Sequence, residues 1–225
     1  MQNNTTSPPE LLEAWDWEIG LPTGEPITRD AAHRNGIPHE AVHLWIVRNS
    51  SSEPELLFQL RAAHKENYPG FLDITVGGHV PYGYCGNKVF KETREEIGII
   101  PIEQDLIDLG WYRYEERTDR LFQRELQHIY LLRSDLDLNQ YRFNDGEVTG
   151  IYAVRLSDVK RIMAGDARFD ITGFDGKEQV ARSVTRKDFH PQLLDPSMDA
   201  YMRVILMSAD ELASTGQVTA RMPDI

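Results

Sequence analysis

The stretch that decides the fold is GGHVPYGYCGNKVFKETREEIGI, residues 77–99. It begins as a glycine-rich loop and continues as a helix, which we expect from about Asn87 to Ile97. Gly98 follows as a C-terminal stop, because glycine readily adopts the left-handed backbone with which helices end. Apolar side chains such as Val89 lie on one side of this helix and are expected to pack against a sheet.

Three carboxylates share another face of the predicted helix. Glu92, Glu95 and Glu96 have the i, i+3, i+4 spacing that makes side chains neighbours on a helix surface. Like charges at this spacing repel one another, so the triplet indicates a cation between them. Mg²⁺ takes oxygen ligands and is commonly held by carboxylates together with substrate phosphates. The alternative, which the triplet alone would favour, is an acidic helix face in contact with water.

Taken with its glycine loop, the stretch resembles the Nudix box of the Nudix hydrolases. The closing half of the box matches residues 91–99, and residues 77–80 match its opening. Counted from Gly78, the first glutamate of the box falls at Tyr84, in a segment that is one residue short. Lys91 stands at the arginine position of the box. The helix carboxylates remain, so the resemblance still implies metal binding.

The resemblance implies a metal-dependent hydrolase that cleaves a diphosphate linkage in a nucleoside diphosphate-type substrate. Mg²⁺ or Mn²⁺ is the implied cofactor, because a divalent ion neutralises a diphosphate and lowers the pKa of a bound water. Glu92 and Glu96 are the implied metal ligands. Glu95 is a third ligand or helps to activate water, and backbone groups near Gly77 complete the coordination sphere.

A catalytic base is often supplied from outside the helix of the box. Two candidates are Glu125, in an expected strand, and Glu147, at the start of the next strand. The alternative for each is ordinary: Glu125 as an exposed strand residue and Glu147 as a turn residue.

Residues next to the box are expected to bind the substrate. Arg61 and Lys65 precede it and could hold phosphate, arginine through bidentate hydrogen bonds. Both could instead be merely exposed. Gly77, Gly78 and His79 are the other expected substrate-binding residues.

The chain also resembles isopentenyl diphosphate isomerases, which share the fold. His33 and His39 lie in a segment like the histidine-bearing segment of those enzymes, and with His79 and Glu125 they match the implied metal ligands. The isomerases need a cysteine acid/base two residues before the histidine that corresponds to His79, and this chain has Gly77 there. An isomerase-like enzyme is therefore the alternative function.

Further departures support a third hypothesis, a Nudix-like ligand-binding module with weakened catalysis. The box lacks its first glutamate and has Lys91 in place of arginine. Two other departures count against the isomerase instead: Gln123 stands where those enzymes have a second strand glutamate, and Cys85, the one cysteine, lies in the variable loop. Metal titration separates a sensor, which binds the ion without turnover, from a scaffold, which does not bind it.

Length and charge bound the remaining possibilities. At 225 residues, one sizeable domain with appendages is expected. The net charge of −12 argues against broad binding to nucleic-acid backbones. The sequence shows no signal-peptide pattern and no run of about 20 apolar residues, so we expect no membrane partner. With a single cysteine, these features favour the cytoplasm.

The whole chain predicts an α/β fold, a Nudix-type α/β/α sandwich around a mixed sheet. Strands are expected at 14–19, 41–47, 55–62, 107–115, 121–132 and 148–154, and helices at 28–36, 157–164 and 196–214, with Ser157 as an N-cap and a loop-rich segment at 166–187. The expected organisation is a flexible tail at 1–13, a Nudix-like domain at 14–165, a C-terminal extension at 166–214 whose helix packs on the domain, and a loose tail at 215–225.

The partner is expected to be a small diphosphate whose attached group the sequence does not name, since specificity lies outside the box. Trp111, Tyr112 and Tyr114 could stack on a base, although aromatic strand residues more often belong to the core. A homodimer, through the N-terminal strand or the C-terminal helix, is left open.

Overall fold

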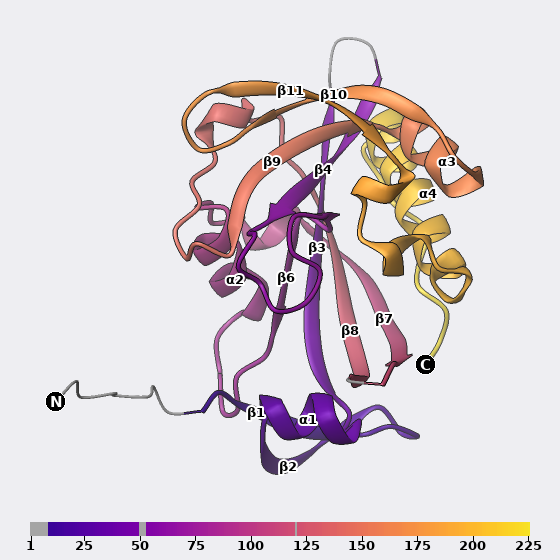
Figure 1. Ribbon diagram of the computed structural model, residues 1–225. Coiled ribbons are helices and arrows are strands. Elements are labelled where there is room, and N and C mark those ends of the chain that lie inside the picture. Colours follow the sequence, from indigo (N-terminus) through magenta and orange to yellow (C-terminus); the bar gives the residue numbers. More distant parts are fainter. Residues whose placement is uncertain (1–8, 50–52, 120) are drawn as a thin grey trace, which may run out of the picture.

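The computed structural model describes residues 9–49, 53–119 and 121–225, in which eleven strands form a mixed sheet with helices on both faces (Figure 1). The strands are β1 (Leu11–Asp16), β2 (Leu21–Thr28), β3 (His39–Asn49), β4 (Pro54–Arg61), β5 (Leu72–Asp73), β6 (Val76–His79), β7 (Leu106–Arg117), β8 (Phe122–Arg133), β9 (Val148–Arg155), β10 (Arg168–Phe174) and β11 (Gln179–Thr185). The helices are α1 (Arg29–Asn35), α2 (Lys88–Glu96), α3 (Leu156–Ala164) and α4 (Asp199–Thr215). This confirms the predicted sandwich.

The register around β3 positions the site. β3 pairs in parallel with β8, which sets His39 opposite Glu125. It pairs antiparallel with β6, which sets Ala41 opposite His79 and His43 opposite Gly77. Residues opposite each other on neighbouring strands point to the same face of a sheet. Side chains from three strands therefore meet on one face.

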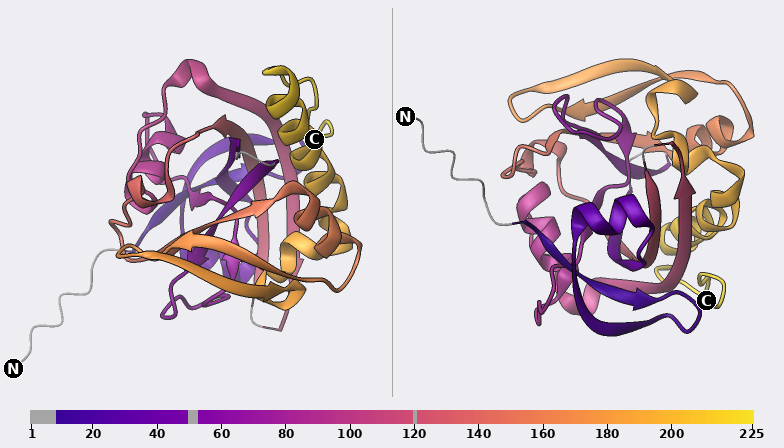
Figure 2. Two further views of the ribbon diagram at one scale, coloured as in Figure 1. Left: turned by 90° about the horizontal axis from the view of Figure 1, so that it is seen from above. Right: turned by 60° about the horizontal axis from the view of Figure 1, so that its bottom comes forward.

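The two faces of the sheet carry separate apolar cores. On one face α3 and α4 cover a core that includes Trp45, Phe58 and Tyr201, all buried. On the other face α2 contributes Val89 to the second core. The two views of Figure 2 show α4 along one side and α1 across the end of the sheet, beside β8. Among the described residues, no helix combines the length and the apolar character needed to cross a membrane.

Local signals produce α2 where the glycine-rich stretch predicts it. The Asn87 side chain accepts a hydrogen bond from the Val89 N–H at 3.1 Å, which caps the helix. Gly98 adopts φ +72°, and a Cβ there would lie 2.7 Å from the Arg142 carbonyl oxygen. Only glycine meets both demands, so the predicted stop is confirmed.

Three local predictions were wrong. α3 begins at Leu156, so Arg155 and not Ser157 is its N-cap residue; the Ser157 N–H and Oγ instead donate to Glu53 Oε1 at 3.1 and 2.8 Å. The expected loop-rich segment contains β10 and β11, which pair antiparallel over their full lengths. The expected loose C-terminal tail lies against β7, since the Met222 N–H donates to the Leu109 oxygen at 2.7 Å and the Met222 side chain is buried.

The N-terminal and C-terminal boundaries also differ from expectation. Residues 11–13 belong to β1 rather than to a flexible tail, because Leu12 is fully buried; residues 1–8 lie outside the described chain. The sheet continues past residue 165, since β10 pairs with β9. The division into a domain and an extension stays a prediction.

Candidate active site

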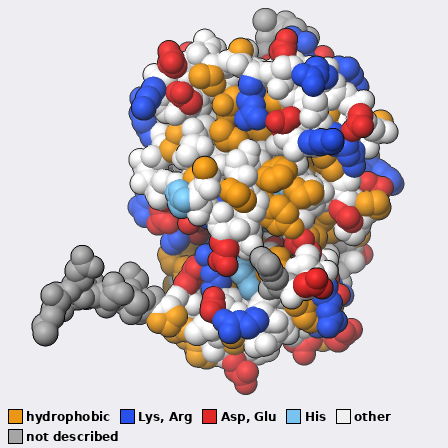
Figure 3. All heavy atoms as spheres, in the orientation of Figure 1, with side chains coloured by type: hydrophobic (Ala, Val, Ile, Leu, Met, Phe, Trp, Pro, Cys, Tyr) orange, Lys and Arg blue, Asp and Glu red, His pale blue; other side chains and the backbone are white. Residues whose placement is uncertain are grey.

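A cavity of about 360 Å³ gathers side chains from both halves of the chain. Its walls come from α1, β3, β4, β6, α2, β8 and the segment after β11. In Figure 3, acidic and basic side chains surround a histidine in the lower half of the face shown. The predicted site residues that line the cavity are Arg61, Lys65, Gly77, Gly78, His79, Glu92, Glu95, Glu125 and Glu147. Glu96 is buried behind the glycine loop, where its Oε2 accepts the Gly77 N–H at 3.2 Å.

Three histidines and one glutamate form the first group of metal-ligating side chains. His33, His39, His79 and Glu125 each offer one ligand atom, and these atoms lie within 4.8 Å of one another. The His33 and His79 Nε2 atoms are 3.2 Å apart, and the His79 Nε2 lies 3.3 Å from Glu125 Oε1. The residues implied by the isomerase resemblance are therefore brought together.

The protonation of this group suits a metal ion. His39 Nδ1 contacts the Ile37 carbonyl oxygen at 2.9 Å, so Nδ1 carries the proton and Nε2 is bare. That Nε2 is buried and has no hydrogen-bond partner among the described residues, which costs free energy that a coordinated ion would remove. Burial, and then the charges of His79 and His39, lowers the pKa of His33 to about 4. Neutral imidazoles with one carboxylate are donors that divalent metal ions accept.

Glu125 is the anionic member of this group. Burial alone would raise its pKa, but the hydrogen bond and charge of His79, and then the charge of His39, lower it. The Gln127 Nε2 donates to its Oε2 at 2.8 Å, and Gln123 donates to its Oε1. Gln123, at the expected position of a second glutamate, thus orients the first one.

A second group consists of carboxylates alone. Glu96, Asp145 and Glu147 each bring one oxygen within 4.8 Å of the others. Burial, and then the charge of Glu92, raises the pKa of Glu96 well above its usual range. Asp145 was missed because Asp145-Gly146 indicates only a turn before β9. A cation placed among these oxygens would relieve their mutual repulsion.

The carboxylate triplet of α2 is divided. Lys91 Nζ lies 2.9 Å from Glu92 Oε1 and 2.8 Å from Glu95 Oε2, so an ammonium stands where the spacing indicated a cation. Within the described chain these two glutamates belong to neither ligand group, whereas Glu96 joins Asp145. Ligation by Glu92 and Glu95 therefore stays a prediction.

The glycines of the loop let α2 approach it. A Cβ at Gly78 would lie 2.4 Å from the Glu92 carboxylate, so a larger residue would displace that side chain. Counted from Gly77 rather than Gly78, five residues separate the glycine from Gly83, and seven more separate Gly83 from Lys91. On this count no residue is missing from the box, and Gly83 replaces its first glutamate.

The predicted phosphate-binding residues reach the cavity as members of ion pairs. Arg61 Nη1 lies 2.9 Å from Asp73 Oδ2, and the Arg61 Nε donates to the Tyr68 carbonyl oxygen at 3.1 Å. Lys65 pairs with Glu147. Both cations thus already compensate carboxylates or hold the loop before β5.

The segment after β11 supplies a wall that no motif indicated. His190, Gln192, Leu193 and Met198 line the cavity. The His190 ring lies 4.1 Å from the Tyr68 ring, centroid to centroid. The sequence around these four cavity-lining residues contains no recognisable motif, so only the tertiary structure could reveal them.

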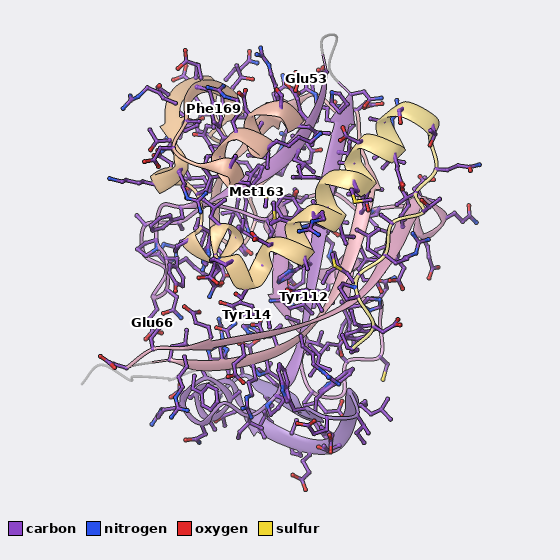
Figure 4. The ribbon with its side chains drawn as sticks, turned by 90° about the vertical axis from the view of Figure 1, so that its right-hand side faces the viewer. Glu53, Glu66, Tyr112, Tyr114, Met163 and Phe169 are labelled. Carbon is purple, nitrogen blue, oxygen red and sulfur yellow. The ribbon has the colours of Figure 1, made fainter. Side chains whose placement is uncertain are left out.

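Of the three aromatic residues proposed to stack on a base, only Tyr114 lines the cavity, and it is buried. The Tyr112 hydroxyl donates to the Ser197 carbonyl oxygen at 2.6 Å, on the side of the sheet that α4 covers (Figure 4). Trp111 stacks on His128 at 4.2 Å, away from the cavity.

Comparison with known proteins finds relatives that are similar in sequence. No protein-family model matches the chain. An uncharacterised Nudix hydrolase of Clostridium acetobutylicum is 25% identical over 200 residues, which cover 88% of this chain and 95% of that protein. Nudix hydrolase 3 of Arabidopsis thaliana is 26% identical over 168 residues, 70% of this chain but 21% of the plant protein. Isopentenyl-diphosphate Delta-isomerase 1 of Photorhabdus laumondii is 26% identical over 146 residues, 64% of this chain and 79% of the isomerase.

Solved structures share the fold. A crystal structure from Deinococcus radiodurans aligns with a TM-score of 0.53 and 25% identity over 70% of this chain and 91% of that one. A Nudix hydrolase from Alicyclobacillus acidocaldarius aligns with a TM-score of 0.51 and 13% identity over 82% of this chain and 97% of that one. The chain is thus similar to Nudix hydrolases in sequence, over most of its length, and it shares their fold.

Proposed function

We propose that the protein is a metal-dependent hydrolase that cleaves a diphosphate linkage in a nucleoside diphosphate-type substrate. One observation carries the proposal: two groups of metal-ligating side chains are built around the same cavity, and lysines and arginines line it as well. Divalent ions and cationic side chains are the two means by which proteins bind and activate diphosphates.

The two ligand groups would hold Mg²⁺ or Mn²⁺. Glu96, Asp145 and Glu147 supply the hard oxygen donors that both ions accept. A bound ion would neutralise phosphate charge and lower the pKa of a water. Glu125, whose pKa is lowered, is a poor proton acceptor and is better suited to holding a cation. Glu95 and Glu147 remain the candidates for the base, since both line the cavity.

Cations beside the cavity would bind the phosphates. Lys65 and Lys91 each compensate carboxylates in the free protein and line the cavity. Arg61 lines it as well, with its Nη1 donating to Asp73. Phosphate oxygens accept charge-assisted hydrogen bonds from such groups.

The histidine group favours a second candidate, an isomerase-like enzyme, because its four ligands match that resemblance. The position of the isomerase cysteine argues against it. A Cβ at Gly77 would lie 2.6 Å from Ile74 Cδ1, so the cavity has no room there for a larger side chain without movement of Ile74. The hydrolase is therefore preferred.

Activity against a substrate panel tests the proposal. Purified protein is incubated with nucleoside di- and triphosphates, nucleotide sugars and isopentenyl diphosphate, with Mg²⁺, Mn²⁺ or a chelator. We expect release of phosphate or pyrophosphate only with metal. Glu96→Gln should lose more than about a hundredfold in rate, since even partners of metal ligands contribute about 10- to 100-fold. Glu103→Gln, at an exposed site in the turn before β7, is the matched control.

The other outcomes point elsewhere. Turnover that persists in chelator, or an unchanged Glu96→Gln rate, contradicts the proposal. Isomerisation of isopentenyl diphosphate supports the second candidate. Metal binding without turnover on the whole panel supports a ligand-binding module. A cytoplasmic location and a homodimer stay predictions.

A further inference from the structure

A chain of hydrogen bonds links the core to the cavity through His43. The Trp45 Nε1–H donates to the Tyr201 hydroxyl oxygen at 2.8 Å, and that oxygen lies 3.0 Å from His43 Nδ1. Trp45 and Tyr201 are fully buried, whereas His43 lines the cavity. Tyr201 belongs to α4, the helix that Figure 4 shows crossing this face of the sheet.

The direction of these bonds follows from the protons available. An indole nitrogen can only donate, so Trp45 occupies a lone pair of the Tyr201 oxygen. The Tyr201 hydroxyl has one proton, and His43 Nδ1 is its only acceptor in the described parts of the chain. A buried O–H left unpaired would cost free energy. The hydroxyl therefore donates to Nδ1, and neutral His43 carries its own proton on Nε2.

The Nε2 edge of His43 lies beside the glycine loop. His43 is opposite Gly77 in the pairing of β3 with β6. A Cβ at Gly77 would lie 3.7 Å from His43 Cδ2, the ring carbon bonded to Nε2. Within the described residues Nε2 has no hydrogen-bond partner, and the missing side chain at Gly77 leaves this edge of the ring uncovered on that side. The ring thus presents an unused donor at the cavity wall.

We propose that His43 is a substrate-binding residue that donates its Nε2–H to a phosphate oxygen, and that Tyr201 and Trp45 are positioning residues that fix this tautomer. The inference rests on the proposed function, because a diphosphate is the assumed ligand. A neutral donor has an advantage at this place. It binds a phosphate oxygen without adding a positive charge that would repel a metal ion on the neighbouring His79 and Glu125.

The tautomer is tested first, by a measurement that needs no activity. Two-bond ¹H–¹⁵N correlation spectra of ¹⁵N-histidine-labelled protein distinguish Nε2–H from Nδ1–H. We expect Nε2–H for His43 in the native protein and a population of Nδ1–H in Tyr201→Phe. The matched control is Tyr130→Phe, since the Tyr130 hydroxyl also lies 3.0 Å from a histidine Nδ1, that of His128, outside the cavity. It should leave the His43 signals unchanged. An Nδ1–H tautomer in the native protein overturns the proposal.

The phosphate contact is tested by calorimetric titration with inorganic pyrophosphate in the presence of Mg²⁺. His43→Leu should bind about tenfold or more weakly, the effect of losing a hydrogen bond to a charged group. His43→Gln should retain most of the affinity, because its amide N–H can reach the position of Nε2. His128→Leu, on the other face, should bind as the native protein does.

The outcomes separate the two proposals. Equal pyrophosphate binding by His43→Leu and native protein overturns the role of His43 and leaves the hydrolase intact. So does a His43→Gln variant that binds as weakly as His43→Leu although both give a native circular dichroism spectrum. A native protein with the Nε2–H tautomer that binds no pyrophosphate overturns the proposed function, and the role of His43 with it.

Discussion

The two ligand groups beside the cavity are stabilised in opposite ways. In the histidine group, burial keeps His33 and His39 neutral, and the bare Nε2 of His39 has no hydrogen-bond partner in the part of the chain that the structure describes. In the carboxylate group and on α2 beside it, the protein supplies its own cations, Lys65 and Lys91. The histidine group can therefore accept an ion directly, whereas at the carboxylate group an ion would have to replace or join an ammonium. Variants can break or sharpen this contrast.

The largest effect is expected for His39→Leu, which removes the bare Nε2 from the histidine group. Affinity for Co²⁺, followed by its visible absorption, should fall about a hundredfold or more, because even partners of ligands contribute about 10- to 100-fold. The exposed His64→Leu is the matched control and should bind Co²⁺ as before. An unchanged affinity in His39→Leu would show that the histidines are merely structural.

A smaller effect, of opposite sign, is expected for Lys91→Met. Without the ammonium, Glu92 and Glu95 repel each other, so the Tm should fall in chelator. Mg²⁺ should then bind about tenfold more tightly and raise the Tm more than in the native protein. The thermal shift against Mg²⁺ concentration measures this, with the exposed Lys177→Met as control. Equal shifts in both variants would refute the idea that Lys91 occupies a cation position.

The next largest expected effect is the pH dependence of the Tm, which the histidine group should shape. Burial lowers the pKa of His33 from 6.5 to about 4, so the unfolded chain takes up the proton first as the pH falls. The contribution of neutral His33 to stability is therefore complete above about pH 6.5 and is lost between there and about pH 4. Metal-free His33→Gln should show a flatter Tm curve over this window. Parallel curves would mean that His33 titrates normally.

The smallest effect is expected for Lys65→Gln, which removes a partly exposed pair with Glu147. Such pairs are worth about 0–1 kcal/mol, so the free energy of unfolding, measured by urea denaturation, should fall by no more than about 1 kcal/mol. Lys160→Gln breaks the exposed pair with Asp210 and should change it as little. A loss of several kcal/mol in Lys65→Gln would show that Lys65 compensates a charge that Glu147 cannot bear alone.

The parts of the fold that could be predicted from the sequence are those with local causes. The limits of α2 follow from a capping side chain at Asn87 and a glycine with positive φ at Gly98. The β10–β11 hairpin was missed because its strands are largely exposed and show little apolar alternation. Local chemistry marks helix ends more clearly than exposed strands.

The candidate site shows the same limit more strongly. His33 and Glu125 were connected only through resemblance, because the parallel pairing of β3 with β8 that brings their segments together leaves no local pattern. Lys91 was interpreted as a substituted arginine, whereas its role toward Glu92 and Glu95 depends on side-chain geometry. Asp145 looked like a turn residue for the same reason.

Part of the cavity wall comes from residues near the C-terminal end of the sequence, which has a consequence for biosynthesis. His190 and Gln192 line the cavity, and Tyr201 is fully buried against the sheet. A nascent chain that has emerged only as far as β9 therefore carries the glycine loop and α2 but only part of the enclosure. Until the ribosome has released α4, the growing polypeptide exposes these acidic and imidazole groups in an incomplete cavity that is open to the surrounding solvent and its metal ions.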